Sequence, residues 1–172
     1  MTEQIKAEIH YDSLYRFAVS LTRQSIDAED LVHQTYLKWL KNRDAIRDTD
    51  RTKSWLFTTL HREFLHSLKT KTKHTLMETE QLEMLAPGKS PDTGNKLDAE
   101  YVMALMQRVP EPFRASLSLF YIQDFSYREI AEVLDVAPGT VMSRIFRGKQ
   151  ILKELMTTIK HGQPAESGGG AS

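Results

Sequence analysis

The chain has 172 residues, of which 40% are hydrophobic and 27% charged, a composition typical of a globular protein. It has no cysteine, which excludes disulfides, thiol nucleophiles and cysteine-ligated zinc. No apolar run reaches the ~20 residues of a membrane span, and the polar N-terminus lacks a signal-peptide core, so we expect a cytoplasmic protein without membrane insertion.

The first seventy residues predict a helical unit, because apolar residues recur at three- and four-residue steps and Gly and Pro are absent before Pro87. We expect one helix over residues 2–21, a second beginning near Asp27 and a third over 53–69. The residues predicted to face inward are Tyr11, Leu14, Tyr15, Ala18, Leu21, Leu31, Val32, Thr35, Tyr36, Trp39, Leu40, Leu56, Leu60, Phe64 and Leu68.

The character of the sequence changes after Lys69, where residues 70–85 are polar and residues 86–95 (APGKSPDTGN) are rich in helix breakers. Helical patterning returns near Lys96, through helices expected at 101–109, 112–123, 126–134 and 138–159. The expected fold is all-α, with two small helical domains at 1–72 and 97–160, a flexible linker at 73–96 and a disordered tail at 161–172.

A helix-turn-helix is predicted between Ser126 and about Leu155. Ser126 and Glu129 have the spacing of a capping box, in which each side chain satisfies the other residue's backbone amide. Asp135 to Ala137 form a short turn, and Pro138 suits the first turn of the next helix because it needs no amide partner there.

The second helix of this motif carries a polar and basic face opposite an apolar one. Hydroxyls and arginines near the start of such a helix suit the major groove, where arginine pairs with guanine, while lysines at the flanks suit phosphates. The alternative is an ordinary amphipathic helix with a solvated basic face. The candidate duplex-binding residues are Thr140, Ser143, Arg144, Arg147, Lys149 and Lys153, and the apolar face consists of Val141, Ile145, Gly148 and Leu152.

Residues 109–152, with the run GTVMSRIFRGKQIL, resemble the fourth conserved region of the extracytoplasmic-function sigma factors. The motif DAEDLV at Asp27–Val32 and Ser54-Trp-Leu56 resemble the second conserved region of the same family. The resemblance implies a protein that is not an enzyme and needs no metal or cofactor. Its implied partners are core RNA polymerase, promoter DNA in duplex and single-stranded form, and an anti-sigma factor.

The resemblance also implies roles for residues of the N-terminal unit. Asp27, Glu29 and Asp30 would bind the largest polymerase subunit, although acids at a helix start also favour the helix macrodipole. The outward face of the third helix would hold the melted minus-10 strand, with Trp55 stacking on a base unless it only caps the core. The candidate minus-10 residues are Arg51, Lys53, Trp55, Thr58, Arg62, His66 and Lys69.

Two other functions fit parts of the sequence. A conventional helix-turn-helix regulator with a helical sensing domain would also bind duplex DNA, but has no need of the acidic motif. A metal enzyme could use His61, Glu63 and His66, yet His61 and His66 point about 140° apart on a helix. The sequence also departs from the sigma pattern at His33, at His66 and at Ala137, which lacks a capping side chain.

Overall fold

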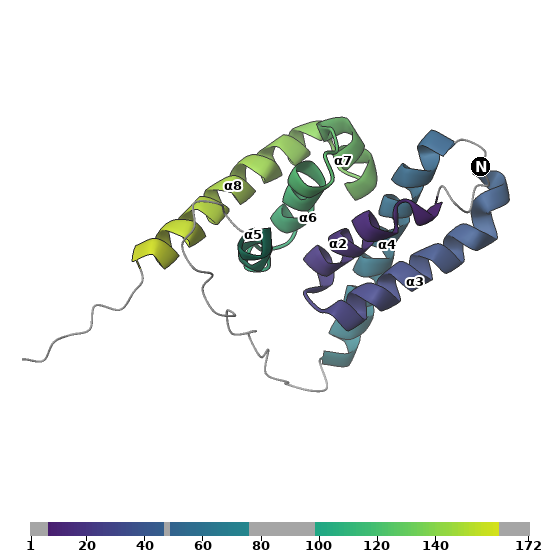
Figure 1. Ribbon diagram of the computed structural model, residues 1–172, viewed down its shortest axis with the longest axis horizontal. Helices are drawn as coiled ribbons and strands as arrows, with labels where there is room; N and C mark the ends of the chain where they lie inside the picture. Colours follow the sequence, from purple (N-terminus) through teal and green to yellow (C-terminus); the bar gives the residue numbers. More distant parts are fainter. Residues whose placement is uncertain (1–6, 47–48, 76–98, 162–172) are drawn as a thin grey trace, which may run out of the picture.

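The computed structural model describes residues 7–46, 49–75 and 99–161 (Figure 1). Every regular element among these residues is helical, so the expected all-α fold is confirmed. The N-terminal unit contains α2 (Tyr11–Thr22), α3 (Ser25–Asn42), η1 (Arg43–Ala45) and α4 (Thr49–Thr75). The C-terminal unit contains α5 (Ala99–Met106), α6 (Phe113–Leu117), the π-helical turn η2 (Ser118–Ile122), α7 (Tyr127–Leu134) and α8 (Pro138–His161).

Three long helices pack around one apolar centre in the N-terminal unit. Phe17 of α2 and Phe57 of α4 are fully buried, with ring centroids 5.5 Å apart. Thr35 of α3 is also fully buried, and its hydroxyl donates to the Leu31 carbonyl at 2.8 Å, which satisfies the only polar group it brings into the core. The core therefore depends on apolar positions at helical spacing, as the sequence predicted.

Several predicted features of these helices are wrong. Helix α2 begins at Tyr11 after a turn, and α4 continues to Thr75, into the residues expected to form the linker. Leu40 is 46% exposed because it lies about 100° around α3 from the buried Trp39. Leu68 is 41% exposed, because it lines a surface groove. Tyr11 is likewise exposed.

The C-terminal unit is held together by the close approach of α6 and α8. A Cβ added to Gly148 would lie 2.8 Å from Cδ1 of the buried Leu117, so only glycine fits without displacement. The helix predicted over residues 112–123 is interrupted, because α6 passes into the π-helical η2 after Leu117. Residues 76–96 of the expected linker, residues 97–98 of the expected C-terminal domain and residues 162–172 of the expected tail lie outside the described residues.

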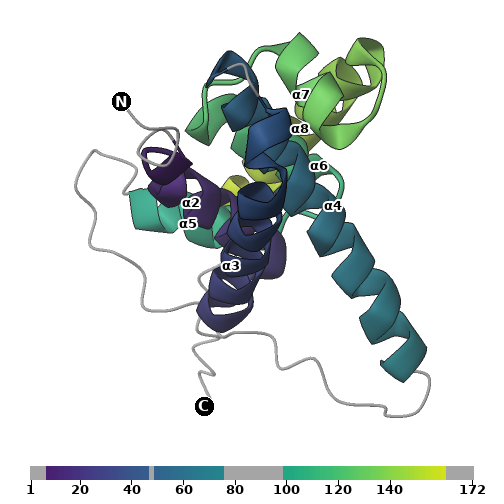
Figure 2. The ribbon, with the colours of Figure 1, turned by 90° about the vertical axis from the view of Figure 1, so that its right-hand side faces the viewer.

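The two units pack against each other rather than standing apart. Helices α2 and α4 contact α6, η2 and α7, and α7 lies beside α4 in both views (Figures 1 and 2). Phe57 of α4 meets Phe125, which precedes α7, edge to face at 4.9 Å. One continuous cluster of buried side chains thus runs through both units. None of the described helices is long and apolar enough to cross a membrane.

Candidate nucleic-acid interface

The predicted helix-turn-helix is confirmed in detail. The Ser126 amide donates to Glu129 Oε2 at 2.7 Å, and the Glu129 amide donates to Ser126 Oγ at 3.2 Å, which completes the capping box of α7. Asp135 ends α7 in the left-handed conformation, with the Val136 amide bonded to the Ala131 carbonyl at 3.0 Å. This backbone pattern fixes the turn into α8 without any ligand.

Helix α8 presents the predicted polar face to solvent. Val141, Ile145 and Gly148 are buried on the opposite side, so the orientation of the helix about its axis is fixed by packing. Lys149 lies with its Nζ 5.3 Å from the centroid of the Tyr121 ring. Of the six candidate duplex-binding residues, Thr140 and Arg144 are half-buried, and Ser143, Arg147, Lys149 and Lys153 are exposed.

The candidate minus-10 residues lie on α4 and differ in accessibility. Trp55 is half-buried and packs against the core. The Nζ of Lys53 lies 4.5 Å from the centroid of the Phe125 ring in the C-terminal unit. Lys53, Trp55 and Thr58 are half-buried, whereas Arg51, Arg62, His66 and Lys69 are exposed.

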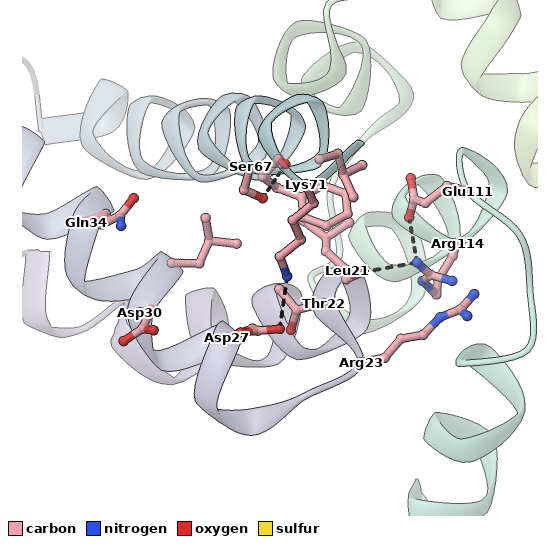
Figure 3. Close-up of a pocket in the computed structure, with 13 residues that line it drawn as sticks. Leu21, Thr22, Arg23, Asp27, Asp30, Gln34, Ser67, Lys71, Glu111 and Arg114 are labelled. Atoms are coloured by element: carbon pink, nitrogen blue, oxygen red, sulfur yellow. Dashed lines mark hydrogen bonds and ion pairs between the residues drawn. The ribbon is translucent and has the colours of Figure 1, made fainter. Parts of the chain in front are cut away.

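The acidic motif occupies the first two turns of α3 beside a groove. Glu29 and Asp30 are exposed, and Asp27 is half-buried, with its Oδ2 3.3 Å from the Nζ of Lys71 on α4 (Figure 3). The groove has a volume of about 490 Å³ and also contains Glu111 and Arg114 of the C-terminal unit. The acids therefore lie next to the boundary between the units.

His61 is a buried residue that sequence reasoning considered only as a metal ligand. It is 7% exposed, and burial, followed by the charge of Arg144, lowers its pKa to about 4. Glu63 instead pairs with Lys38 of α3. Within the part of the chain that the structure describes, no three His, Cys, Asp or Glu residues converge as metal ligands.

Arg114 at the start of α6 was not singled out by sequence reasoning. It is 3% exposed, and its guanidinium donates to the Val109 carbonyl at 2.8 Å and to the Leu21 carbonyl of α2 at 3.2 Å. Its Nη2 lies 3.4 Å from Glu111 Oε1. Burial raises the pKa of Glu111 although the charge of Arg114 opposes this. Glu111 lies three residues before Arg114, which is a local pair in the sequence, but the two carbonyl acceptors leave no signal there because every residue has a backbone carbonyl.

A helix-turn-helix with an accessible basic helix, joined to a second helical unit, defines a DNA-binding protein of transcription. Residues 7–74 match the family described as Sigma-70 region 2, and residues 99–152 match Sigma-70, region 4. These matches do not favour the ligand-sensing regulator, because the N-terminal unit is itself a sigma region.

Similar proteins include two curated relatives and one solved structure. The ECF RNA polymerase sigma factor EcfG of Rhodopseudomonas palustris is 30% identical over 144 residues, covering 84% of this chain and 79% of that protein. The ECF RNA polymerase sigma factor SigM of Bacillus subtilis strain 168 is 23% identical over 149 residues, covering 86% of this chain and 91% of that protein. The sigma factor RpoE in a co-crystal structure with the anti-sigma factor NepR from Bartonella quintana has 26% identity and a TM-score of 0.76, and the match covers 91% of this chain and 98% of that one.

The chain belongs to the extracytoplasmic-function (ECF) sigma factors of RNA polymerase. Its function is that of a sigma factor in transcription initiation, which directs core RNA polymerase to promoters.

Proposed function

We propose that this sigma factor divides promoter binding between its two units. The C-terminal unit, residues 97–160, binds the minus-35 duplex. The N-terminal unit binds core polymerase and the melted minus-10 strand. It comprises the expected residues 1–72 and residues 73–75, with which α4 ends. The rest of the expected linker, residues 76–96, joins the two units, and the expected tail, residues 161–172, begins at the last residue of α8. The observation that carries this proposal is the basic face of α8, exposed on a helix whose orientation is fixed by packing.

The minus-35 contacts come from the exposed face of α8. Ser143 and Arg147 lie one turn apart on this face and can reach base edges together, because a helix entering the major groove presents its N-terminal half to the bases. Lys149 and Lys153 lie farther along the helix and bind phosphates. Thr140 and Arg144 also contact the minus-35 duplex, after their half-buried side chains become exposed.

The minus-10 contacts come from α4. Trp55 stacks on an unpaired base with the part of its indole that the core leaves open, a contact worth about 1–3 kcal/mol. The exposed cations Arg62 and Lys69 follow the phosphates along the helix. Arg51 and Lys53 approach the strand at the start of α4, and Thr58 and His66 lie between these contacts.

Polymerase binding is assigned to Asp27, Glu29 and Asp30. Exposed carboxylates at the start of α3 offer a compact negative surface to a basic partner, and Asp27 exchanges its Lys71 contact for one with polymerase. In this proposal the protein acts in the cytoplasm, catalyses no reaction itself and uses no metal or cofactor. Because RpoE of Bartonella quintana was crystallised with an anti-sigma factor, we propose that this chain has such a partner too.

A pull-down with core polymerase, followed by run-off transcription from promoters that the holoenzyme selects, tests this function. We expect the full chain to bind core polymerase and to produce promoter-specific transcripts. A chain that binds duplex DNA but neither binds polymerase nor supports a transcript would contradict the proposal.

A further inference from the structure

Tyr121 is an exposed aromatic side chain beside the proposed minus-35 surface, and it is not one of the six candidate duplex-binding residues. It belongs to η2 and is 52% exposed, so it adds little to the core. The Nζ of Lys149 on α8 lies 5.3 Å from the centroid of its ring. A cation within about 6 Å of an aromatic centroid is attracted by the negative face of the ring. The Tyr121 ring therefore holds the end of a side chain that is proposed to bind phosphate.

A row of aromatic rings keeps Tyr121 in this position. Tyr121 packs edge to face against Phe120, with ring centroids 4.9 Å apart and an interplanar angle of 90°. Phe120 in turn stacks on Tyr127, the first residue of α7, with centroids 5.2 Å apart. Phe120 is half-buried and packs against the core, which anchors the row. The row therefore connects the ring that contacts Lys149 to the first helix of the helix-turn-helix.

The backbone that carries Tyr121 departs from the α-helix. The Gln123 amide bonds to the Ser118 carbonyl, five residues earlier, at 3.2 Å, which is the bond pattern of a π-helix. The extra residue in this turn rotates the residues that follow about the helix axis, relative to a continuous α-helix. Single π-helical turns occur frequently at functional sites. The form of η2 is thus a second indication that its exposed side chain has a role beyond packing.

Lys149 lies where a helix in the major groove meets the DNA backbone. From Ser143 to Lys149, α8 rises about 9 Å at ~1.5 Å per residue. The major groove is about 12 Å wide, so a helix that places Ser143 and Arg147 on base edges brings Lys149 to a wall of the groove, where the phosphates lie. Lys149 is exposed, and no carboxylate among the described residues lies within ion-pair distance of it. Its ammonium is therefore available to an anion.

The ring contact prepares Lys149 for phosphate binding. A lysine side chain has a flexible four-carbon stem, and fixing it on a phosphate costs rotamer entropy. The Tyr121 ring restricts Lys149 before DNA binds, so part of this entropy is already lost in the free protein. The ring covers one side of the ammonium, which leaves N–H donors on the other side for a phosphate oxygen. The ring and a phosphate can therefore contact the same ammonium at once.

We propose that Tyr121 is a positioning residue of the minus-35 surface, whose ring holds the Lys149 ammonium at the edge of the major groove, where it binds a backbone phosphate of the duplex. Tyr121 acts through Lys149 and reads no base, so it raises affinity for duplex DNA without selecting its sequence. This role rests on the proposed minus-35 function of α8. It adds a side chain from η2 to a surface otherwise formed by one helix.

Two substitutions of Tyr121 in the holoenzyme test this role. Tyr121→Leu removes the ring but keeps an apolar side chain, whereas Tyr121→Phe keeps the ring and loses only the hydroxyl. Each variant is assembled with core polymerase and titrated with a promoter fragment that the wild-type holoenzyme selects. Tyr121→Leu should weaken binding about threefold to tenfold, the range expected for immobilising one long side chain. Tyr121→Phe should bind within about 1.5-fold of wild type, because the ring is still present.

The loss caused by Tyr121→Leu should depend on Lys149 alone. In a Lys149→Ala background the substitution should have no further effect, because no ammonium is left to position. In a Lys153→Ala background it should keep its full effect, since Lys153 is exposed one turn farther along α8 and the ring contacts Lys149. The free Tyr121→Leu chain should melt within about 3 °C of wild type, because an exposed side chain contributes little stability.

Three results would overturn the inference. The first is wild-type binding by Tyr121→Leu, and the second is an equal loss of affinity in Tyr121→Phe and Tyr121→Leu, which would assign the effect to the hydroxyl. The third is a loss that persists in the Lys149→Ala background, which would make Tyr121 a support of the fold. A wild-type holoenzyme that binds no promoter, in contrast, contradicts the proposed function itself.

Discussion

The two helical units differ in how they hold their proposed binding residues. In the C-terminal unit these residues lie on one helix, α8, whose apolar side is locked by α6, and four of the six are exposed. In the N-terminal unit they are divided between α3 and α4, where Asp27 is paired with Lys71 and the Nζ of Lys53 lies over the Phe125 ring. The C-terminal surface thus lies on a single helix fixed by packing, whereas the N-terminal surface is spread over two helices and includes one residue, Lys53, that contacts the C-terminal unit.

The largest effect is expected at the acidic motif. The double substitution Glu29→Lys with Asp30→Lys replaces two exposed carboxylates of the proposed polymerase surface with two cations, so core polymerase binding should weaken by at least about tenfold. Binding is measured by competition with the wild-type protein. Glu132→Lys, an exposed acid on α7, is the matched control and should bind normally. If the double variant binds core polymerase as tightly as the Glu132→Lys control, the acidic motif does not contact polymerase.

The buried His61 should make stability depend on pH. Its folded pKa of about 4 lies below the ordinary 6.5, so the unfolded chain binds more protons between these values. The stabilisation by neutral His61 is therefore complete above about pH 6.5 and is lost as the pH falls toward 4. Between pH 7 and 5, the free energy of unfolding should fall by about 1–2 kcal/mol more in wild type than in His61→Gln.

The measurement is urea unfolding at both pH values. His66→Gln, an exposed histidine one and a half turns farther along α4, should keep the wild-type pH dependence. If His61→Gln keeps it as well, the imidazole is not buried in the neutral form.

The close approach of α6 and α8 predicts opposite effects for two glycine substitutions. Gly148→Ala brings a methyl group against Leu117 and should lower the free energy of unfolding by about 1–2 kcal/mol. A Cβ at Gly139 meets no atom within 4 Å, so Gly139→Ala should be neutral or slightly stabilising. Thermal unfolding distinguishes the two, and a Gly148→Ala protein as stable as wild type would mean that α8 lies farther from α6.

A smaller effect separates stability from binding within the helix-turn-helix. Ser126→Ala removes the cap of α7 and should cost about 1 kcal/mol of stability, while Ser143→Ala on the exposed face should weaken duplex binding without lowering stability. Thermal melts and duplex titrations on both variants provide the comparison. An equal loss of stability in both would show that the face of α8 also supports the fold.

Local sequence signals account for most of what could be predicted. The capping box, the turn after Leu134 and the helix beginning at Pro138 each depend on residues within a few positions, so the helix-turn-helix followed directly from the sequence. The exposure of Leu40 and Leu68 could not be predicted in this way, because it depends on which other helix covers each side of a long helix.

The contact between the units was also beyond sequence reasoning. Arg114 binds a carbonyl 93 residues away, and Phe125 meets a ring on α4, so neither contact produces a periodic or local pattern. The acceptor is a backbone carbonyl, so the residue that supplies it can be of any type and cannot be recognised in the sequence. Only the folded chain therefore identifies the residues that join the two units.

The most direct test of the division of labour is the double substitution Arg144→Ala with Arg147→Ala in α8. The account predicts that this variant loses at least about tenfold in binding to promoter DNA, since each arginine contact to a base is worth about 1–3 kcal/mol, yet binds core polymerase as tightly as wild type. Parallel titrations of the full chain with promoter duplex and with core polymerase give both numbers. Loss of polymerase binding together with DNA binding would contradict the assignment of these functions to separate units.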